Sequence, residues 1–372
     1  MNPKRLLLVQ NDPQLATCFG EALAAIGVDV HVAPNGQSAL HRFHEVEPDL
    51  ILLDLIVPMM DGPRLINAFR KERKTAALPI IVLPTSIEPL ALAATDHATK
   101  VLERYADPVA AVVNAVETAL GGTASLLRSK SESAEFEARL ARLHAGLPTR
   151  VTELRHRLQS LATNQAGPNG IPDFFQAVHN FAEQTVLLNL KAVVTLACAL
   201  EALTFDIHEM PELLNPSTMR TLGQGIDLLG KLLEEDRWTQ VKHPSDARIL
   251  VVEDDPNAQQ LITASIKLVQ LDALAFASPT AGLGSLQTGI FDLVFLDIGL
   301  PEMNGFDLCT KVRALPQFEK IPIVFLTGMA TFQNRAQSTL SGGNDFIGKP
   351  FNVRELGIKA LIWVFKGQLG LI

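Results

Sequence analysis

Two stretches of this chain carry the same residues at the same spacing, and this repeat constrains the fold more than any other feature. Adding 243 to several N-terminal residue numbers finds the same residue type again near the C-terminus, always in the same order. The matching pairs are Asp12 and Asp255, Pro13 and Pro256, Asp49 and Asp292, Asp54 and Asp297, Pro58 and Pro301, Gly62 and Gly305, and Pro79 and Pro322. Because chance does not produce such a series, residues 1–122 and 246–372 are predicted to be two copies of one domain.

Each copy alternates short apolar runs with longer amphipathic segments. The runs are rich in branched residues and apolar on both faces, which is typical of buried parallel strands. They lie at residues 6–9, 50–55 and 79–83, and again at 249–252, 293–298 and 322–326. This alternation predicts an α/β fold with a doubly wound parallel sheet, in which functional residues follow the carboxyl ends of the strands.

Polar residues follow these runs in the second copy. Glu253 and Asp254 follow the first strand, Asp297 ends the third, Thr327 ends the fourth, and Lys349 follows the fifth. All of them should meet at one edge of the sheet, where three neighbouring carboxylates need a cation such as Mg²⁺. With that charge neutralised, Asp297 can attack a phosphoryl donor. Thr327 and Lys349 can then hold the transferred oxygens.

With these residues, the second copy resembles a receiver domain of the response-regulator family. The resemblance implies a flavodoxin-like fold, a phosphoryl group accepted on Asp297, and Mg²⁺ as the cofactor. The implied metal ligands are Glu253, Asp254, Asp297 and the backbone carbonyl of Gly299. Thr327 occupies the family's switch-hydroxyl position, Lys349 its lysine position and Phe346 its aromatic switch position.

The first copy has different residues at most of these positions. Gln10 and Asn11 replace the acidic pair, and Asp54 is retained. The other replacements are Pro84, followed by Thr85, at the hydroxyl position and Arg104 opposite Lys349. Without the acidic pair a magnesium ion loses most of its ligands, so we predict a pseudo-receiver that serves in docking or dimerisation. Phosphorylation of Asp54 stays open, because an arginine can also hold a phosphate.

The middle of the chain, residues 123–245, lacks strand-like runs. Apolar residues recur at helical spacing over residues 135–160, and three further helical segments are predicted at 173–189, 190–205 and 216–233. A loop rich in Gly, Pro and Asn separates the first two at residues 164–172. Several long helices with short links predict an antiparallel helical bundle.

This bundle resembles a histidine phosphotransfer (HPt) domain. His179 falls on that family's phosphorylated histidine, and Leu147-Pro148 and Leu200-Glu201 fall on two of its other features. An exposed imidazole would suit the role, because its near-neutral pKa leaves a nucleophilic nitrogen. Ala182 and Glu183 stand where the family has Lys and Gly. Three interpretations stay open: His179 carries phosphate, the bundle is a degenerate HPt scaffold, or His179 is an ordinary surface or packing residue.

Composition limits the classes of partner and the compartment. The net charge of −8 argues against a broad nucleic-acid or anionic membrane surface. The three cysteines lie far apart and form neither a disulfide framework nor a metal-binding pair, which indicates a reducing, cytoplasmic environment. Residues 188–203, the most apolar long stretch, contain Lys191 and Glu201 and are too short to span a bilayer. We therefore expect no membrane anchor.

These observations predict a two-component phosphorelay protein ordered as pseudo-receiver, HPt-like bundle and receiver. The expected partners are a histidine kinase or HPt phosphodonor and a downstream signalling protein, with a homodimer as a further expectation from the family. Two alternatives stay open. The chain is a phosphorylation-gated binding or scaffold module, or it is the regulatory part of a longer protein with an enzymatic output domain such as a nucleotide cyclase. An enzymatic activity beyond phosphoryl transfer is left undecided.

Overall fold

The computed structural model describes residues 3–60, 62–71, 78–83, 98–102, 108–121, 130–328 and 340–372. The chain divides into two compact units. The first consists of Met1–Arg150 and Gln176–Asn189, and the second of Val151–Phe175 and Leu190–Ile372. Pro84, Thr85 and Arg104, which the sequence analysis singled out in the first copy, lie outside the described residues.

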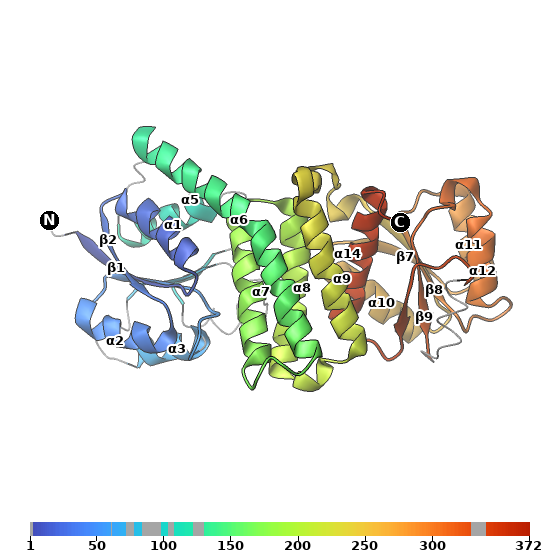
Figure 1. Ribbon diagram of the computed structural model, residues 1–372, viewed down its shortest axis with the longest axis horizontal. Helices are drawn as coiled ribbons and strands as arrows, with labels where there is room; N and C mark the ends of the chain where they lie inside the picture. The colour runs from blue at the N-terminus through green and yellow to red at the C-terminus, as the bar shows by residue number, and fades with distance from the viewer. Residues whose placement is uncertain are drawn as a thin grey trace. The chain divides into compact units, whose positions relative to one another are not determined.

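The first unit contains a five-stranded parallel sheet, of which β1 and β2 are labelled in Figure 1. Its strand order is β2-β1-β3-β4-β5. Its strands are β1 (Lys4–Val9), β2 (Val28–Ala33), β3 (Leu50–Leu53), β4 (Ile80–Val82) and β5 (Lys100–Val101). Its helices include α1 (Pro13–Ala24), α2 (Gly36–Val46), α3 (Gly62–Arg70) and α5 (Pro108–Ala119). This order is the flavodoxin-like, doubly wound arrangement predicted from the sequence.

Both faces of this sheet are buried. In β1, Leu6 and Leu8 belong to a cluster with residues of α1 and α5, whereas Leu7 and Val9 belong to a cluster with residues of α2 and α3. Leu143, from the first half of helix α6 (Lys130–Ala162), joins the first cluster. Strands covered on both sides need apolar side chains at every position, which explains their continuous apolar runs.

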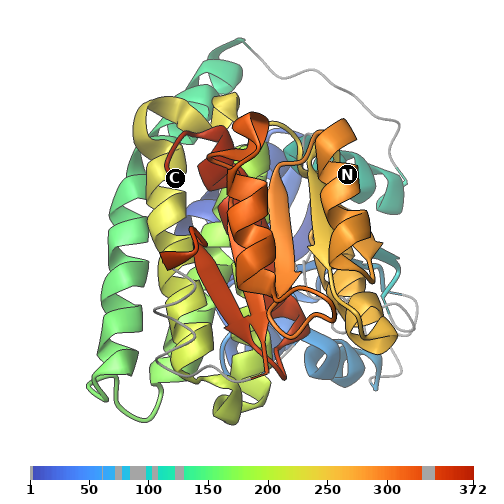
Figure 2. The same cartoon turned by 90° about the vertical axis from the view of Figure 1, so that its right-hand side faces the viewer.

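The second unit contains a sheet with the equivalent order, β10-β9-β8-β6-β7. Its strands are β6 (Arg248–Val252), β7 (Asp272–Phe276), β8 (Leu293–Asp297), β9 (Ile323–Thr327) and β10 (Asp345–Gly348), and Figure 2 shows them side by side. Its flanking helices include α10 (Pro256–Leu268), α11 (Pro279–Thr288), α12 (Gly305–Arg313) and α14 (Val353–Gln368). The same topology in both sheets agrees with the sequence repeat.

Long helices make up the part of the sequence between the two sheet domains. They are α6, α7 (Gly170–Leu187), α8 (Lys191–Glu209) and α9 (Pro216–Leu233), and the described part of residues 123–245 contains no strand. Short 3₁₀ helices lie at Pro211–Leu213, Glu234–Gln240, Pro244–Asp246 and, in the second sheet domain, Pro316–Phe318. The four predicted helices are therefore present, while their assembly into one antiparallel bundle stays a prediction. Among the helices described, none has the length and apolarity that a bilayer crossing requires.

Within the second unit, helix α14 packs against α8 and α9. The buried carboxylate of Glu355 accepts hydrogen bonds from the hydroxyls of Ser217 (2.6 Å) and Thr221 (2.9 Å) on α9. Lys359 is fully buried and pairs with Asp345 at 2.8 Å. Charged side chains of α14 thus bond to the neighbouring helix and strand.

Most of the repeated residues have structural roles. Asp12 and Asp255 cap helices α1 and α10 through main-chain N–H groups, and a proline follows each as the first helical residue. Asp49 and Asp292 accept hydrogen bonds from the main chain of Arg5 (2.9 Å) and Arg248 (2.8 Å). At Gly62 and Gly305 a side chain would collide with the backbone of Leu55 and Asp297, respectively. The repeat therefore reports mainly the shared fold.

Candidate functional site

The polar residues predicted in the second copy meet at the carboxyl edge of its sheet. Glu253 directly follows β6, while Asp297 and Thr327 are the last residues of β8 and β9. These three side chains are buried, with exposed fractions of 1%, 6% and 3%. Lys349 follows β10, and its main-chain N–H donates to the carbonyl of Thr327 at 2.7 Å. The parallel topology brings the four residues together, as the sequence predicted.

Lys349 links the two buried carboxylates. Its Nζ lies 2.6 Å from Oε2 of Glu253 and 2.8 Å from Oδ1 of Asp297. The other oxygen of Asp297, Oδ2, accepts a hydrogen bond from the main-chain N–H of Gly299 at 2.9 Å. The Asp297 carboxylate is thus oriented by one cation and one backbone donor.

The charges at this site shift two pKa values. Burial raises the pKa of Glu253 above its ordinary value, and the nearby charge of Asp297 acts in the same direction against the opposing effect of Lys349. For Lys349, burial alone would lower the pKa of the ammonium. Its hydrogen bonds to Asp297 and Glu253 outweigh that effect and raise it. The lysine is therefore a firmly protonated cation between two carboxylates.

The acidic cluster has the composition of a hard-cation site. One carboxylate oxygen from each of Glu253, Asp254 and Asp297 lies within 4.8 Å of the others, and Asp254 is exposed to solvent. A ligand set of oxygens with one side open to water is what Mg²⁺ prefers, because it keeps several of its own waters. The residues present fit the ion. Binding of the ion by the main-chain carbonyl of Gly299 stays a prediction.

Phe346, the predicted aromatic switch residue, lies in β10 and contacts a neighbouring helix. The guanidinium of Arg220 on α9 stacks over its ring, 4.8 Å from the centroid, in a cation–π contact. Sequence analysis did not identify Arg220, because only the packing of α9 on this side of the sheet brings the two residues together. The contact places a charged helix residue on the side chain proposed to respond to phosphorylation.

The equivalent edge of the first sheet keeps Asp54 in the same setting. Asp54 follows β3 and is 2% exposed, and its Oδ1 accepts from the main-chain N–H of Ile56 at 2.9 Å, as Asp297 accepts from Gly299. Gln10, at the position of Glu253, is also buried. The backbone that supports a phosphoacceptor carboxylate is therefore preserved, although the acidic pair is not.

A polar face of helix α7 covers this edge within the first unit. Gln176 Nε2 donates to Asn11 Oδ1 at 3.2 Å and to the carbonyl of Ile56 at 3.4 Å. Gln10 Nε2 donates to Glu183 Oε2 at 3.0 Å. Gln184 on the same face donates to the carboxylate of Asp12. The helix thus bonds to residues that follow two different strands.

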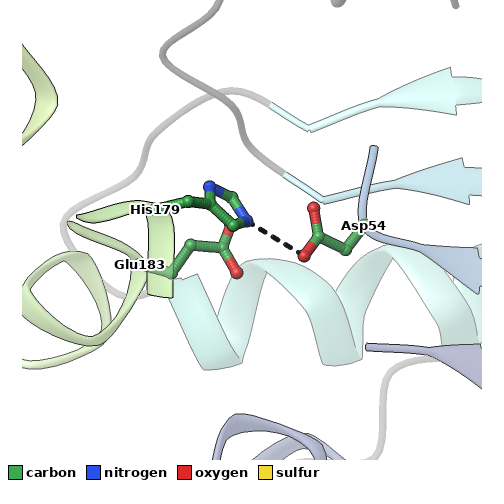
Figure 3. Close-up of side chains that lie close together, drawn as sticks. All are labelled: Asp54, His179 and Glu183. Atoms are coloured by element: carbon green, nitrogen blue, oxygen red, sulfur yellow. Dashed lines mark hydrogen bonds and ion pairs between the residues drawn. The ribbon is translucent and has the colours of Figure 1, made fainter. Parts of the chain in front are cut away.

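His179 lies at the centre of this face. Its Nε2 is 3.1 Å from Oδ2 of Asp54, and the imidazole is only 1% exposed (Figure 3). The expectation of an exposed imidazole is therefore wrong, because α7 presents this face to the sheet. A phosphodonor outside the chain cannot reach His179 in this conformation. Its role as a phosphate carrier stays a prediction.

The sequence contained a signal for this contact. Gln176, His179, Asn180, Glu183 and Gln184 recur at helical spacing, so they share one face of α7. The exposed imidazole was expected from the resemblance to an HPt domain, and a polar stripe on a helix usually faces solvent as well. Glu183, taken there as a departure from the HPt pattern, is one of the residues that contact the sheet edge.

Both sheet domains of this chain are similar to domains of known proteins. The family model described as response regulator receiver domain matches residues 6–104 and 249–360. The DNA-binding dual master transcriptional regulator RpaA of Synechocystis sp. is 30% identical over 109 residues, which are 29% of this chain and 45% of RpaA. The DNA-binding response regulator MtrA of Mycolicibacterium smegmatis is 35% identical over 109 residues, 29% of this chain and 46% of MtrA. The match therefore spans about half the length of these relatives.

Among solved structures, the receiver domain of the sensor histidine kinase PA1611 from Pseudomonas aeruginosa is 28% identical, and that structure is described with a magnesium ion in its active-site cleft. The match covers 32% of this chain and 97% of that domain, with a TM-score of 0.30. The family model covers more than half of the 372 residues, in two copies. The chain belongs to the response regulator receiver family.

Proposed function

We propose that this protein accepts a phosphoryl group on Asp297 from a histidine kinase or a phosphotransfer protein, as a step in two-component phosphorelay signalling. The observation that carries the proposal is the cluster of Glu253, Asp254 and Asp297 with Lys349 bonded into it. The family assignment supports two-component signalling in general. Asp297 as the acceptor rests on the site's chemistry.

The residues divide the work of the transfer between them. A carboxylate oxygen of Asp297 attacks phosphorus as the bond from phosphorus to the donor's nitrogen breaks, and the leaving imidazole takes up a proton. Glu253, Asp254 and Asp297 would hold Mg²⁺, which would supply positive charge for the phosphoryl oxygens. Lys349 and the hydroxyl of Thr327 bind oxygens of the transferred group. Lys349 must exchange carboxylate contacts for phosphoryl contacts, so it senses the modification directly.

A second candidate concerns the N-terminal half, which we propose as a docking or scaffold module. The observation that favours it is the burial of His179 against Asp54, together with the hydrogen bonds from α7 to the sheet edge. Two side chains that bond to each other in a buried contact are poor acceptors for an external phosphoryl group. The same burial supports the alternative that the chain is a phosphorylation-gated binding module.

The test is phosphorylation of the full chain with acetyl phosphate and Mg²⁺. The wild type is compared with Asp297→Asn, Asp54→Asn and His179→Ala, and base-labile acyl phosphate is distinguished from acid-labile phosphohistidine. We expect base-labile label that disappears only in Asp297→Asn. Undiminished label in Asp297→Asn would contradict the proposal. Acid-labile label that depends on His179 would contradict the scaffold role.

A further inference from the structure

We propose that Asp54, His179 and Glu183 form a binding site for a divalent transition-metal cation of the Zn²⁺ type. This site is separate from the magnesium site proposed at Asp297 and does not depend on phosphorylation there. The proposed site lies at the carboxyl edge of the first sheet, which helix α7 covers.

The geometry brings three metal-ligating side chains to one point. One ligand atom from each of the three residues lies within 4.8 Å of the others, and the Nε2 of His179 is 3.1 Å from Oδ2 of Asp54. His179 and Glu183 are four residues apart on α7, so both side chains project from the same face toward the end of β3 (Figure 3). Metal–ligand bonds of about 2.0–2.2 Å place neighbouring ligand atoms roughly 3 Å apart, so small side-chain rotations complete the site.

Hydrogen bonds from residues outside the cluster orient two of the ligands. Gln10 Nε2 donates to Oε2 of Glu183 at 3.0 Å, and the main-chain N–H of Ile56 donates to Oδ1 of Asp54 at 2.9 Å. Each bond holds one oxygen of its carboxylate in place. Outer hydrogen bonds of this kind are typical of metal sites, because they hold ligands in the binding orientation.

The charge balance favours a dication over a phosphoryl group. Asp54 is almost completely buried, and Glu183 supplies a second carboxylate beside it. A divalent cation balances both carboxylates and accepts the lone pair of a neutral imidazole. A phosphoryl group on His179 would instead face two negative side chains. The arrangement that disfavours phosphate at His179 therefore favours a metal ion.

The ligand types distinguish this site from the one in the second sheet domain. Glu253, Asp254 and Asp297 offer oxygen alone, which suits Mg²⁺. The first site combines one imidazole nitrogen with two carboxylates, a set that suits Zn²⁺ and other first-row transition metals. Gln10 stands where the second copy has Glu253, and Glu183 from α7 brings a carboxylate back next to it. Glu183 on α7 thus supplies a carboxylate near the position where Gln10 stands in place of a glutamate.

The test measures metal binding by the full chain after treatment with a chelator. Calorimetric titration with Zn²⁺ in metal-free buffer should show one tight site in the wild type. The Asp297→Asn variant, which lacks one carboxylate of the other cluster, should bind Zn²⁺ at the same tight site. Glu183→Gln, Asp54→Asn and His179→Ala should each weaken it by at least about tenfold. Glu183→Gln is nearly isosteric, and its circular dichroism without metal should match that of the wild type.

Controls separate this site from adventitious binding by surface histidines, of which the chain has several among its nine. His156 is exposed on α6, and His156→Ala should bind Zn²⁺ like the wild type. Substitution with Co²⁺ should give visible absorption bands that are lost in His179→Ala. The proposal fails if the tight site is absent, or if Zn²⁺ affinity is the same in Glu183→Gln, Asp54→Asn and the wild type.

Discussion

At the scale of single residues, Asp54 and Asp297 occupy the same place in the two sheets but have different neighbours. Each accepts a hydrogen bond from the main chain two residues later. Asp297 then pairs with Lys349 at 2.8 Å, from the segment after β10, whereas Asp54 meets His179 at 3.1 Å, from helix α7. The same carboxylate is therefore prepared for different chemistry by the group that faces it.

Glu253 provides a pH-dependent test of the second site. Burial raises its pKa above the ordinary value of 4.5, so its proton is held more tightly in the folded protein than in the unfolded chain. This contribution to stability is fully present below pH 4.5 and is lost as the pH rises through the folded pKa. At neutral pH the ionised carboxylate therefore lowers the free energy of unfolding.

Glu253→Gln removes this penalty, because the amide stays neutral. We expect the variant to be more stable than the wild type by roughly 1 kcal/mol at pH 7, measured by urea unfolding with EDTA. The difference should shrink as the pH falls through the raised pKa of Glu253 and should be gone below pH 4.5, where the wild-type carboxyl is protonated in both states. A variant less stable at pH 7, or a difference independent of pH, would show that the contact with Lys349 dominates over burial.

At the scale of elements, helix α7 gives the first sheet contacts that have no counterpart among the described residues of the second sheet domain. The two equivalent helix caps show this difference. Asp255 is exposed and caps α10 alone, whereas Asp12 is buried, caps α1 and also accepts a hydrogen bond from Gln184 on α7. Arg150 of α6 also lies 3.7 Å from the Asp12 carboxylate. A matched pair of substitutions can therefore measure what these added contacts of Asp12 contribute to stability.

Asp255→Ala should lower the free energy of unfolding by about 1 kcal/mol, the usual value of a helix cap. Asp12→Ala should lower the free energy of unfolding by at least about 1 kcal/mol more than Asp255→Ala does, because it also leaves the buried amide of Gln184 without its acceptor. Chemical denaturation of the two variants, followed by circular dichroism, measures both changes. Equal costs would mean that the contact of α7 with this cap adds nothing to stability.

At the scale of the whole molecule, the face of the second sheet domain that contains β10 and α14 is occupied by the chain's own helices. Arg220 of α9 covers the ring of Phe346, and Ser217 and Thr221 bond to Glu355. The homodimer expected from the family resemblance stays a prediction, and a dimer through this face would have to form with α8 and α9 in place. A phosphoryl group at Asp297 that moves Phe346 would therefore act first on α9.

Hydrogen–deuterium exchange can follow this coupling in the full chain. After loading with beryllofluoride and Mg²⁺, we expect altered amide exchange in β10 and in the part of α9 around Arg220. Because Arg220→Ala removes the contact with Phe346, it should reduce the response of α9 while leaving that of β10. The same response of α9 in wild type and Arg220→Ala would exclude this contact as the route.

The sequence by itself determined the duplicated α/β domain, the positions of three strands in each copy, and the residues at the carboxyl edge of the second sheet. These follow from local causes: buried parallel strands must be apolar throughout, and residues after such strands meet at one edge. Only the tertiary structure decided what surrounds Asp54 and Phe346. A periodic pattern shows that Gln176, His179 and Glu183 share a face, but not what that face contacts. Asp54 and His179 are 125 positions apart, and the packing of α7 on the sheet brings them together.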